Sequence, residues 1–112
     1  MKHFILDEFR CKCCGRVEMD PCFLAMLDDA RTIAGVPFAI TSGYRCPRHN
    51  AAVGSTSKNH ISGRAADIRV INGPKRIRII KGLITAGFTR IGIGTDFIHA
   101  DTMDAIDSCW LY

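Results

Sequence analysis

The apolar residues of this chain recur with two different periods, and each period predicts a kind of secondary structure. Helical spacing, with apolar residues three and four positions apart, occurs in two segments. One segment begins at Asp20-Pro21, a typical helix start, and ends at Gly35. The other begins at Gly73-Pro74 and ends near Gly87. The expected core-facing residues are Phe23, Leu24, Leu27, Ala30 and Ile33 in the first helix and Ile77, Ile80, Leu83 and Ile84 in the second.

Shorter runs with alternating or β-branched apolar residues predict strands between and after these helices. The predicted strands are residues 38–41, 65–70, 88–94 and 97–102. A short helix is predicted from Cys46 to near Gly54, followed by a polar loop at residues 55–59. The order of the elements predicts an α+β domain, in which helices pack against a small, mainly antiparallel sheet.

The length and composition of the chain fit one globular domain. The chain has 112 residues, of which 47% are hydrophobic and 23% charged. These values allow one hydrophobic core and leave little room for a second. We therefore expect a single domain over residues 1–112, in which residues 1–19 form a cysteine-rich N-terminal arm anchored by Phe4 or Phe9.

The sequence gives no sign of membrane insertion or export. Its apolar runs are all shorter than the roughly 18 residues of a membrane span. The N-terminus becomes acidic at Asp7-Glu8, before the apolar core of a secretory signal could form. We therefore expect a protein with no signal peptide and no membrane partner, made in the cytoplasm.

The net charge is modest and does not identify a partner. Lys and Arg number 15 against 11 Asp and Glu, a formal charge of +4. This excess fits ordinary solubility, and it also fits weak attraction to nucleic acid or to bacterial cell wall. We interpret the basic cluster Lys75-Arg76-Ile77-Arg78 as a solvated helix face. A nucleic-acid binder would need interleaved aromatic residues or regular Cys/His spacing, so no nucleic-acid partner is expected.

Six cysteines are many for this length: Cys11, Cys13, Cys14, Cys22, Cys46 and Cys109. A disulfide framework is disfavoured, because the cytosol keeps thiols reduced. The cluster at residues 11–14 lacks the two separate Cys-x-x-Cys pairs of zinc ribbons. We interpret these cysteines as buried free thiols, with a structural zinc ion held by the cluster and Cys22 as the alternative.

Two histidines and one aspartate predict a metal site of the catalytic type. His60 stands before the turn Ser62-Gly63, which leads into the predicted strand that contains Asp67. His99 lies on a later strand and reaches the same point if the two strands are neighbours. Two imidazoles and one carboxylate bind Zn2+ and leave a position for water, whereas structural zinc sites are closed by four protein ligands. The sequence therefore predicts a zinc hydrolase.

Other charged residues are candidates for the remaining catalytic roles. Asp96, three residues before His99, can take a proton from the attacking water and deliver it to a leaving amine. Arg45 can pair with a substrate carboxylate or stabilise an oxyanion. Asp101 is either a carboxylate that orients an imidazole or a solvated residue at the end of a strand.

The motifs that carry these residues resemble the M15 family of zinc peptidases. They are Ser42-Gly43-Tyr44-Arg45, His60-x-x-Gly63-x-Ala65-x-Asp67 and Asp96-x-x-His99. The resemblance covers roughly residues 38–102, and residues 9–15 also resemble the start of small phage-associated members. The family includes D-Ala-D-Ala carboxypeptidases and dipeptidases, and phage endolysins that cleave L-alanyl-D-glutamate bonds.

The resemblance implies a fold, a cofactor and a role for each matching residue. It implies the small α+β fold shared by DD-peptidases and the Hedgehog signalling domain, with Zn2+ on His60, Asp67 and His99. Asp96 matches the catalytic carboxylate of the family and Arg45 its substrate- and transition-state-binding arginine. We also assign Ser42 and Tyr44 to substrate binding.

The chain departs from the family pattern in two places. Lys58 stands where many members have a serine, two residues before the first histidine. The last motif reads Asp96-Phe97-Ile98, whereas some members carry Glu and Trp there. Both departures concern substrate choice, and neither involves a zinc ligand.

We therefore expect a zinc-dependent hydrolase of bacterial peptidoglycan stem peptides. It would be a monomer, released through a phage-made membrane hole or carried as a virion component. The motifs do not distinguish D-Ala-D-Ala carboxypeptidase from L-Ala-D-Glu endopeptidase activity, and Tyr44, Phe97 and Trp110 are candidate pocket walls. The alternative is a binding module that keeps the fold and the zinc ion without catalysis.

Overall fold

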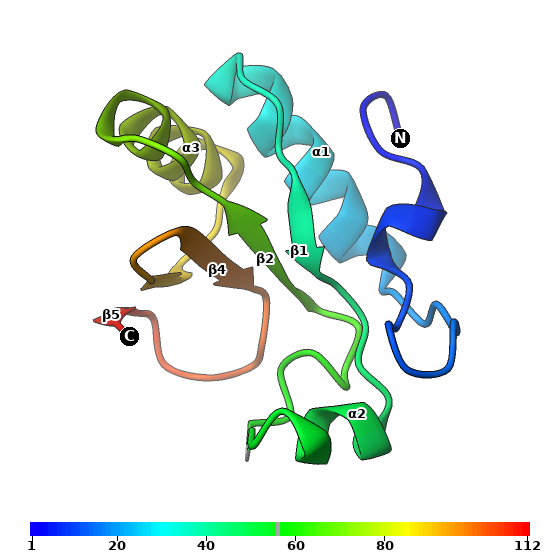
Figure 1. Cartoon of the computed structure of the whole chain (residues 1–112). Helices are drawn as coiled ribbons and strands as arrows, with labels where there is room; N and C mark the ends of the chain where they lie inside the picture. Colours follow the sequence, from blue (N-terminus) through cyan, green and yellow to red (C-terminus); the bar gives the residue numbers. More distant parts are fainter. Residues whose placement is uncertain (56) are drawn as a thin grey trace.

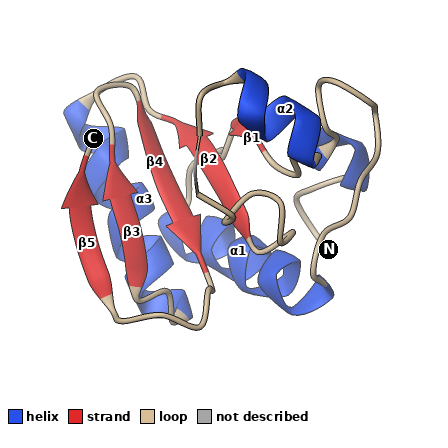
Figure 2. Ribbon diagram, turned by 90° about the horizontal axis from the view of Figure 1, so that it is seen from below, coloured by secondary structure: helices blue, strands red, loops and turns tan. Residues whose placement is uncertain are grey.

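The computed structural model describes residues 1–55 and 57–112 and shows an α+β domain, as predicted. Thr56, in the predicted polar loop, lies outside the described residues. In chain order the elements are the 3-10 helix η1 (Leu6–Phe9), α1 (Pro21–Ala34), β1 (Ile40–Ser42), α2 (Pro47–Ala52), β2 (Ala65–Arg69), α3 (Gly73–Ala86), β3 (Arg90–Ile93), β4 (Phe97–Asp101) and β5 (Ser108–Leu111). Helices α1 and α3 lie together on one face of the sheet, and α2 lies apart from them near β1 (Figures 1 and 2).

The strands form one sheet in the order β1-β2-β4-β3-β5. The pairs β1–β2, β2–β4 and β3–β4 are antiparallel, which confirms a mainly antiparallel sheet. Strand β5 was not predicted, and it pairs with β3 in the parallel direction. It places the C-terminus at the opposite edge of the sheet from β1 (Figure 2).

Both long helices begin and end where the sequence predicts. The Asp20 side chain accepts a hydrogen bond of 2.9 Å from the backbone N–H of Phe23 and so caps α1. Asn72 caps α3 in the same way, through a bond of 2.8 Å to the backbone N–H of Lys75. The helices end at Gly35 and Gly87, which adopt left-handed backbone conformations.

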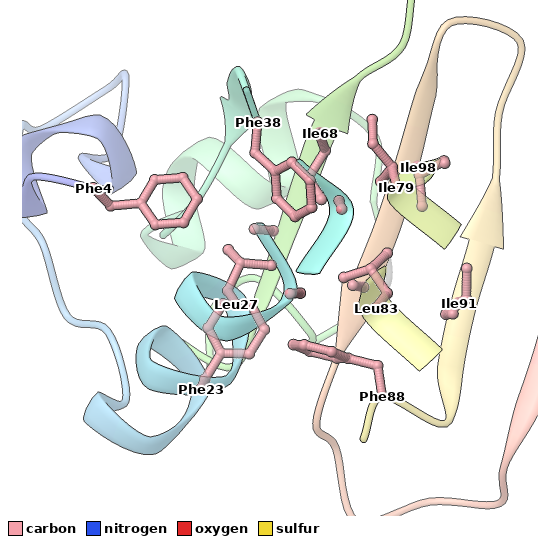
Figure 3. Packing of buried hydrophobic residues seen from close by; sticks show 14 of the residues in the cluster. Phe4, Phe23, Leu27, Phe38, Ile68, Ile79, Leu83, Phe88, Ile91 and Ile98 are labelled. Carbon is pink, nitrogen blue, oxygen red and sulfur yellow. The ribbon is translucent and has the colours of Figure 1, made fainter. Parts of the chain in front are cut away.

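The main core lies between these helices and the sheet (Figure 3). The predicted helix faces are partly wrong, because Ile33, Ile77 and Ile84 are exposed. Ile79, which was not predicted to face the core, is fully buried. The cause is a close helix contact at Gly82, where an added Cβ would lie 2.5 Å from the carbonyl oxygen of Ala30. This contact fixes the rotation of α3 about its axis and turns Ile79 inward.

The N-terminal arm packs against the part of the chain that leads from β1 to α2. Phe4 and Phe9 are both buried, with ring centroids 5.3 Å apart, so the predicted aromatic anchor uses both rings. The backbone N–H of Tyr44 donates a bond of 2.9 Å to the carbonyl oxygen of Phe9. Within the described residues, no helix has the length and apolar character needed to cross a membrane.

Candidate active site

Strands β2 and β4 bring two of the predicted ligands together. Successive side chains on a strand point to opposite faces, and Ile68 and Ile98 belong to the core beneath the helices. Their neighbours Asp67 and His99 therefore lie on the other face, and they are direct partners in the β2–β4 register. His99 Nδ1 is 3.0 Å from Asp67 Oδ1.

His60 reaches the same carboxylate from the turn before β2. Its Nε2 is 3.4 Å from Asp67 Oδ1. One side-chain donor atom from each of His60, Asp67 and His99 lies within 4.8 Å of the other two, so these residues can hold a metal ion. Both histidines are buried, and Asp67 is partly exposed toward the adjacent cavities.

The other nitrogen of each imidazole has an acceptor of its own. His60 Nδ1 is 2.8 Å from the carbonyl oxygen of Gly43. A carbonyl only accepts, so Nδ1 carries the proton and Nε2 is left with its lone pair facing Asp67. His99 Nε2 is 2.7 Å from Asp101 Oδ2, so it carries the proton of that ring. The lone pair of His99 Nδ1 then faces Asp67, as that of His60 Nε2 does. Metal-binding histidines are ordinarily oriented in this way, so the donor set fits a divalent metal ion.

The charges around the cluster also favour a cation. Burial alone would raise the pKa of Asp67, but the interactions with the His60 and His99 imidazoles outweigh it and hold that pKa well below its usual value. Burial would lower the pKa of His99, yet Asp101 and Asp67 raise it. The two carboxylates thus favour positive charge at this point.

Asp101 is part of the site rather than a solvated residue at a strand end. It is 1% exposed and accepts from Arg90 Nε at 2.7 Å and from Asn59 Nδ2 at 3.2 Å. Sequence reasoning did not find Arg90, Asn59 or the Gly43 carbonyl. Gly43 lies against the N-terminal arm, since an added Cβ would be 2.6 Å from the Cα of Phe9.

Two adjacent cavities open beside the ligand cluster, with volumes of about 460 and 300 Å3. They share the lining residues Arg45, Val53, Asp67 and Phe97. The larger cavity also includes Ser42 and Asp96, and the smaller includes His60 and His99. The structure therefore places Arg45, Asp96 and Ser42 in one cleft with the predicted ligands.

Arg45 is held in the cleft by three side chains. Its Nε donates to Ser42 Oγ at 3.1 Å, and one terminal nitrogen lies 3.4 Å from Asn50 Oδ1. The other terminal nitrogen is 3.6 Å from Asp67 Oδ2. Asp96 is exposed and stands just before β4, at the rim of the larger cavity.

The aromatic candidates lie in different places. Tyr44 is buried beside Cys11 and Cys46, outside the lining of both cavities described above. A hydrogen bond to Glu18, together with burial, raises the pKa of Tyr44 to about 12.

The C-terminal aromatic residues pack against the ligand cluster. Trp110, on β5, has its ring 5.5 Å from that of His99. Tyr112, which sequence reasoning missed, lines the smaller cavity, and Phe97 lines both. Tyr112 follows the unpredicted strand β5, so no local pattern pointed to it.

A three-residue ligand cluster that opens into a cleft beside an arginine and a carboxylate is typical of metal-dependent hydrolases. A model of the family Peptidase M15 matches residues 2–101, and the chain therefore belongs to the peptidase M15 family. Members of this family are generally metal-dependent. Residues 102–112, which include β5, lie outside the match. A comparison with curated protein sequences gives no match.

Proposed function

We propose that this protein is a zinc-dependent peptidase that hydrolyses peptide bonds in bacterial peptidoglycan stem peptides. The observation that supports this most strongly is the convergence of His60, Asp67 and His99 at a cleft that also contains Arg45 and Asp96. The family match supports the peptidase chemistry. Phage association and the choice of bond are predictions from the sequence motifs.

The ligand set supports zinc because it consists of two imidazoles and one carboxylate. A bound zinc ion supplies a Lewis acid that lowers the pKa of a coordinated water and polarises a substrate carbonyl. His60 and His99 present one lone pair each, while Gly43 and Asp101 accept from the opposite nitrogens. The protein contributes imidazole orientations that these two acceptors hold in place.

Asp96 is the proposed proton carrier. Its carboxylate is exposed at the rim of the cavity that Asp67 also lines. We assign it to accept a proton from the attacking water and to return that proton to the departing nitrogen. The neighbouring carboxylates cannot share this role, since Asp67 is assigned to the metal and Asp101 is bonded to His99 and Arg90.

The larger cavity suits a peptide that carries carboxylates. Its lining includes the cationic side chains of Lys12, Arg45 and Arg69. Stem peptides present free carboxylates next to their peptide bonds, and a guanidinium binds a carboxylate through two parallel hydrogen bonds. Arg45 is the cation closest to the ligand cluster, so we assign it to the substrate carboxylate or to the oxyanion that forms during attack.

Replacing Arg45 by lysine is expected to lower kcat/KM by about 100-fold, the effect of losing one oxyanion or substrate contact. Lysine keeps the charge but cannot bond Ser42, Asn50 and a substrate carboxylate in one plane. Steady-state kinetics on a stem peptide measure the effect. Arg48→Lys, an exposed residue of α2, is the matched control and should behave like the wild type. Equal kinetics for both variants would remove Arg45 from the proposed site.

Asp101→Asn is expected to weaken zinc binding by about 10- to 100-fold, because the carboxylate that orients His99 is lost. Competition with a chromophoric chelator measures the affinity. Asp104→Asn is the matched control, since Asp104 is an exposed carboxylate that pairs with Arg64. An unchanged affinity in Asp101→Asn, with the fold intact by circular dichroism, would contradict the orienting role.

The proposed function is tested by digesting purified peptidoglycan and identifying the new termini by mass spectrometry. Release of D-alanine identifies a carboxypeptidase, and new N-terminal D-glutamate identifies an L-Ala-D-Glu endopeptidase. Binding of peptidoglycan by the zinc-loaded protein without any new terminus would contradict the proposal and would identify a non-catalytic module.

A further inference from the structure

A second group of metal-binding side chains lies outside the proposed active site. The sulfur atoms of Cys11, Cys14 and Cys46 all lie within 4.8 Å of one another. Cys11 and Cys14 belong to the N-terminal arm, and Cys46 immediately precedes α2. Cys46 is 35 residues from Cys11 in sequence, so only the folded chain brings these thiols together.

The arm is folded into a tight turn that presents two of these thiols on one side. The backbone N–H of Gly15 donates to the carbonyl oxygen of Cys11 at 2.9 Å, and that of Cys11 donates to the carbonyl oxygen of Arg16 at 2.8 Å. In sequence, Cys11 and Cys14 have the Cys-x-x-Cys spacing that supplies half of a structural zinc site. The sequence lacks a second such pair, and the fold supplies Cys46 in its place.

Backbone N–H groups also point at the sulfur atoms. The N–H of Cys46 donates to Cys11 Sγ at 3.4 Å, and the N–H of His49 donates to Cys46 Sγ at 3.4 Å. Hydrogen bonds to sulfur stabilise thiolate, which is the form that binds metal ions. The first bond joins the arm to the start of α2, whereas the second is the local N-cap of α2.

A fourth thiol lies within reach of this group. The Cys13 side chain is exposed and lies near that of Cys46, outside the group of three whose sulfur atoms are within 4.8 Å of one another. By contrast, Cys22 and Cys109 are exposed at other places, at the start of α1 and on β5. Three of the six cysteines therefore gather at one point with Cys13 beside them, and of the six only Cys11 and Cys46 are buried as predicted.

We propose that Cys11, Cys14 and Cys46, with Cys13 as the fourth ligand, bind a second zinc ion with a structural role. Four thiolates close the coordination shell, which distinguishes this site from the open set at His60, Asp67 and His99. Soft thiolates select zinc over magnesium or calcium. The sequence alternative that included Cys22 is replaced by a site that uses Cys46.

The ion would join the N-terminal arm to the segment that carries Arg45. Cys46 directly follows Arg45, and the neighbouring Tyr44 is already bonded to Phe9 of the arm. Lys12, inside the cysteine turn, lines the larger cavity. A metal ion at this point would hold the arm and the Arg45 segment together beside that cavity. The hydrophobic core of so small a chain stabilises such a contact only weakly.

Cobalt substitution tests the site without reference to activity. Thiolate ligands give intense near-ultraviolet charge-transfer absorption with Co2+, and the His60 site contains no thiolate. We expect this absorption when the reduced, metal-free wild type is titrated with Co2+, and its displacement by Zn2+. Cys46→Ser and Cys14→Ser should lose it, and Cys13→Ser should weaken it. The matched controls are Cys22→Ser and Cys109→Ser, whose exposed thiols lie away from this group and whose variants should keep the full absorption.

Metal content and thermal unfolding complete the test. The wild type is expected to contain two zinc ions per chain, and His60→Ala one. Removal of the cysteine-bound ion should lower Tm by about 10 °C or more, since structural zinc contributes directly to folding. No charge-transfer absorption in the reduced wild type would overturn the proposal, even if the serine variants fail to fold. A disulfide among these cysteines in protein prepared under reducing conditions would also overturn it.

Discussion

Replacing His60 by alanine is expected to remove the zinc ion of the proposed active site and to lower peptidoglycan hydrolysis by at least about 1000-fold. The Lewis acid contributes several kcal/mol of transition-state stabilisation, and each 1.4 kcal/mol is a factor of ten in rate. Asp67 and His99 alone would not bind zinc tightly, because a catalytic site uses three protein ligands. Zinc content and the rate of release of new amino groups from peptidoglycan measure the two effects.

The matched control for this variant is His3→Ala, because His3 is exposed on the N-terminal arm and its ring bonds to Thr32, away from the ligand cluster. It should keep zinc and activity. Circular dichroism of metal-free His60→Ala and wild type separates loss of the metal from loss of the fold. A folded His60→Ala that hydrolyses peptidoglycan at the wild-type rate would refute the metal assignment.

Asp96→Asn is expected to lower kcat by about 100- to 10,000-fold while zinc remains bound, as removal of a general acid–base group does. Asparagine has nearly the same shape but cannot take the proton from the attacking water. Because Asp96 is exposed and is not one of the three residues of the ligand cluster, the fold and the metal affinity should not change. Kinetics and zinc content on the same preparation measure both properties.

Asp29→Asn, an exposed residue of α1 on the helical side of the sheet, is the control with the same chemical change. Its kcat should equal that of the wild type. If Asp96→Asn also retained full kcat, the proton would have to pass through another group, and Asp96 would be a turn residue without a catalytic role.

The ends of the long helices could be predicted because they are set by local chemistry. Asp20 and Pro21 specify the start of α1, and Gly35 and Gly87 specify ends, without any distant partner. Strand β5 could not be predicted in this way. Its side chains are mostly exposed, and it is specified by parallel pairing with β3 across the sheet. The rotation of α3 was equally inaccessible, since isoleucines lie on several of its sides and the contact at Gly82 selects among them.

The candidate site likewise has residues that local motifs predict and residues that they do not. His60, Asp67, His99, Arg45 and Asp96 come from short motifs, and the structure gathers them at one cleft. The residues that orient them depend on strand register and on packing of the arm. The Arg90 side chain reaches Asp101 because these residues are partners in the β3–β4 register. No local pattern in the sequence indicates such a pair.

Activity of the metal-depleted and zinc-restored protein on purified peptidoglycan tests the central claim most directly. The new amino groups released are counted for three samples: zinc-loaded chain, chelator-treated chain, and treated chain with zinc restored and its metal content measured. We expect release to stop on chelation and to return with zinc, whereas magnesium should not restore it. Undiminished release by the metal-free chain, or none by the zinc-loaded chain, would contradict a zinc peptidase centred on His60, Asp67 and His99.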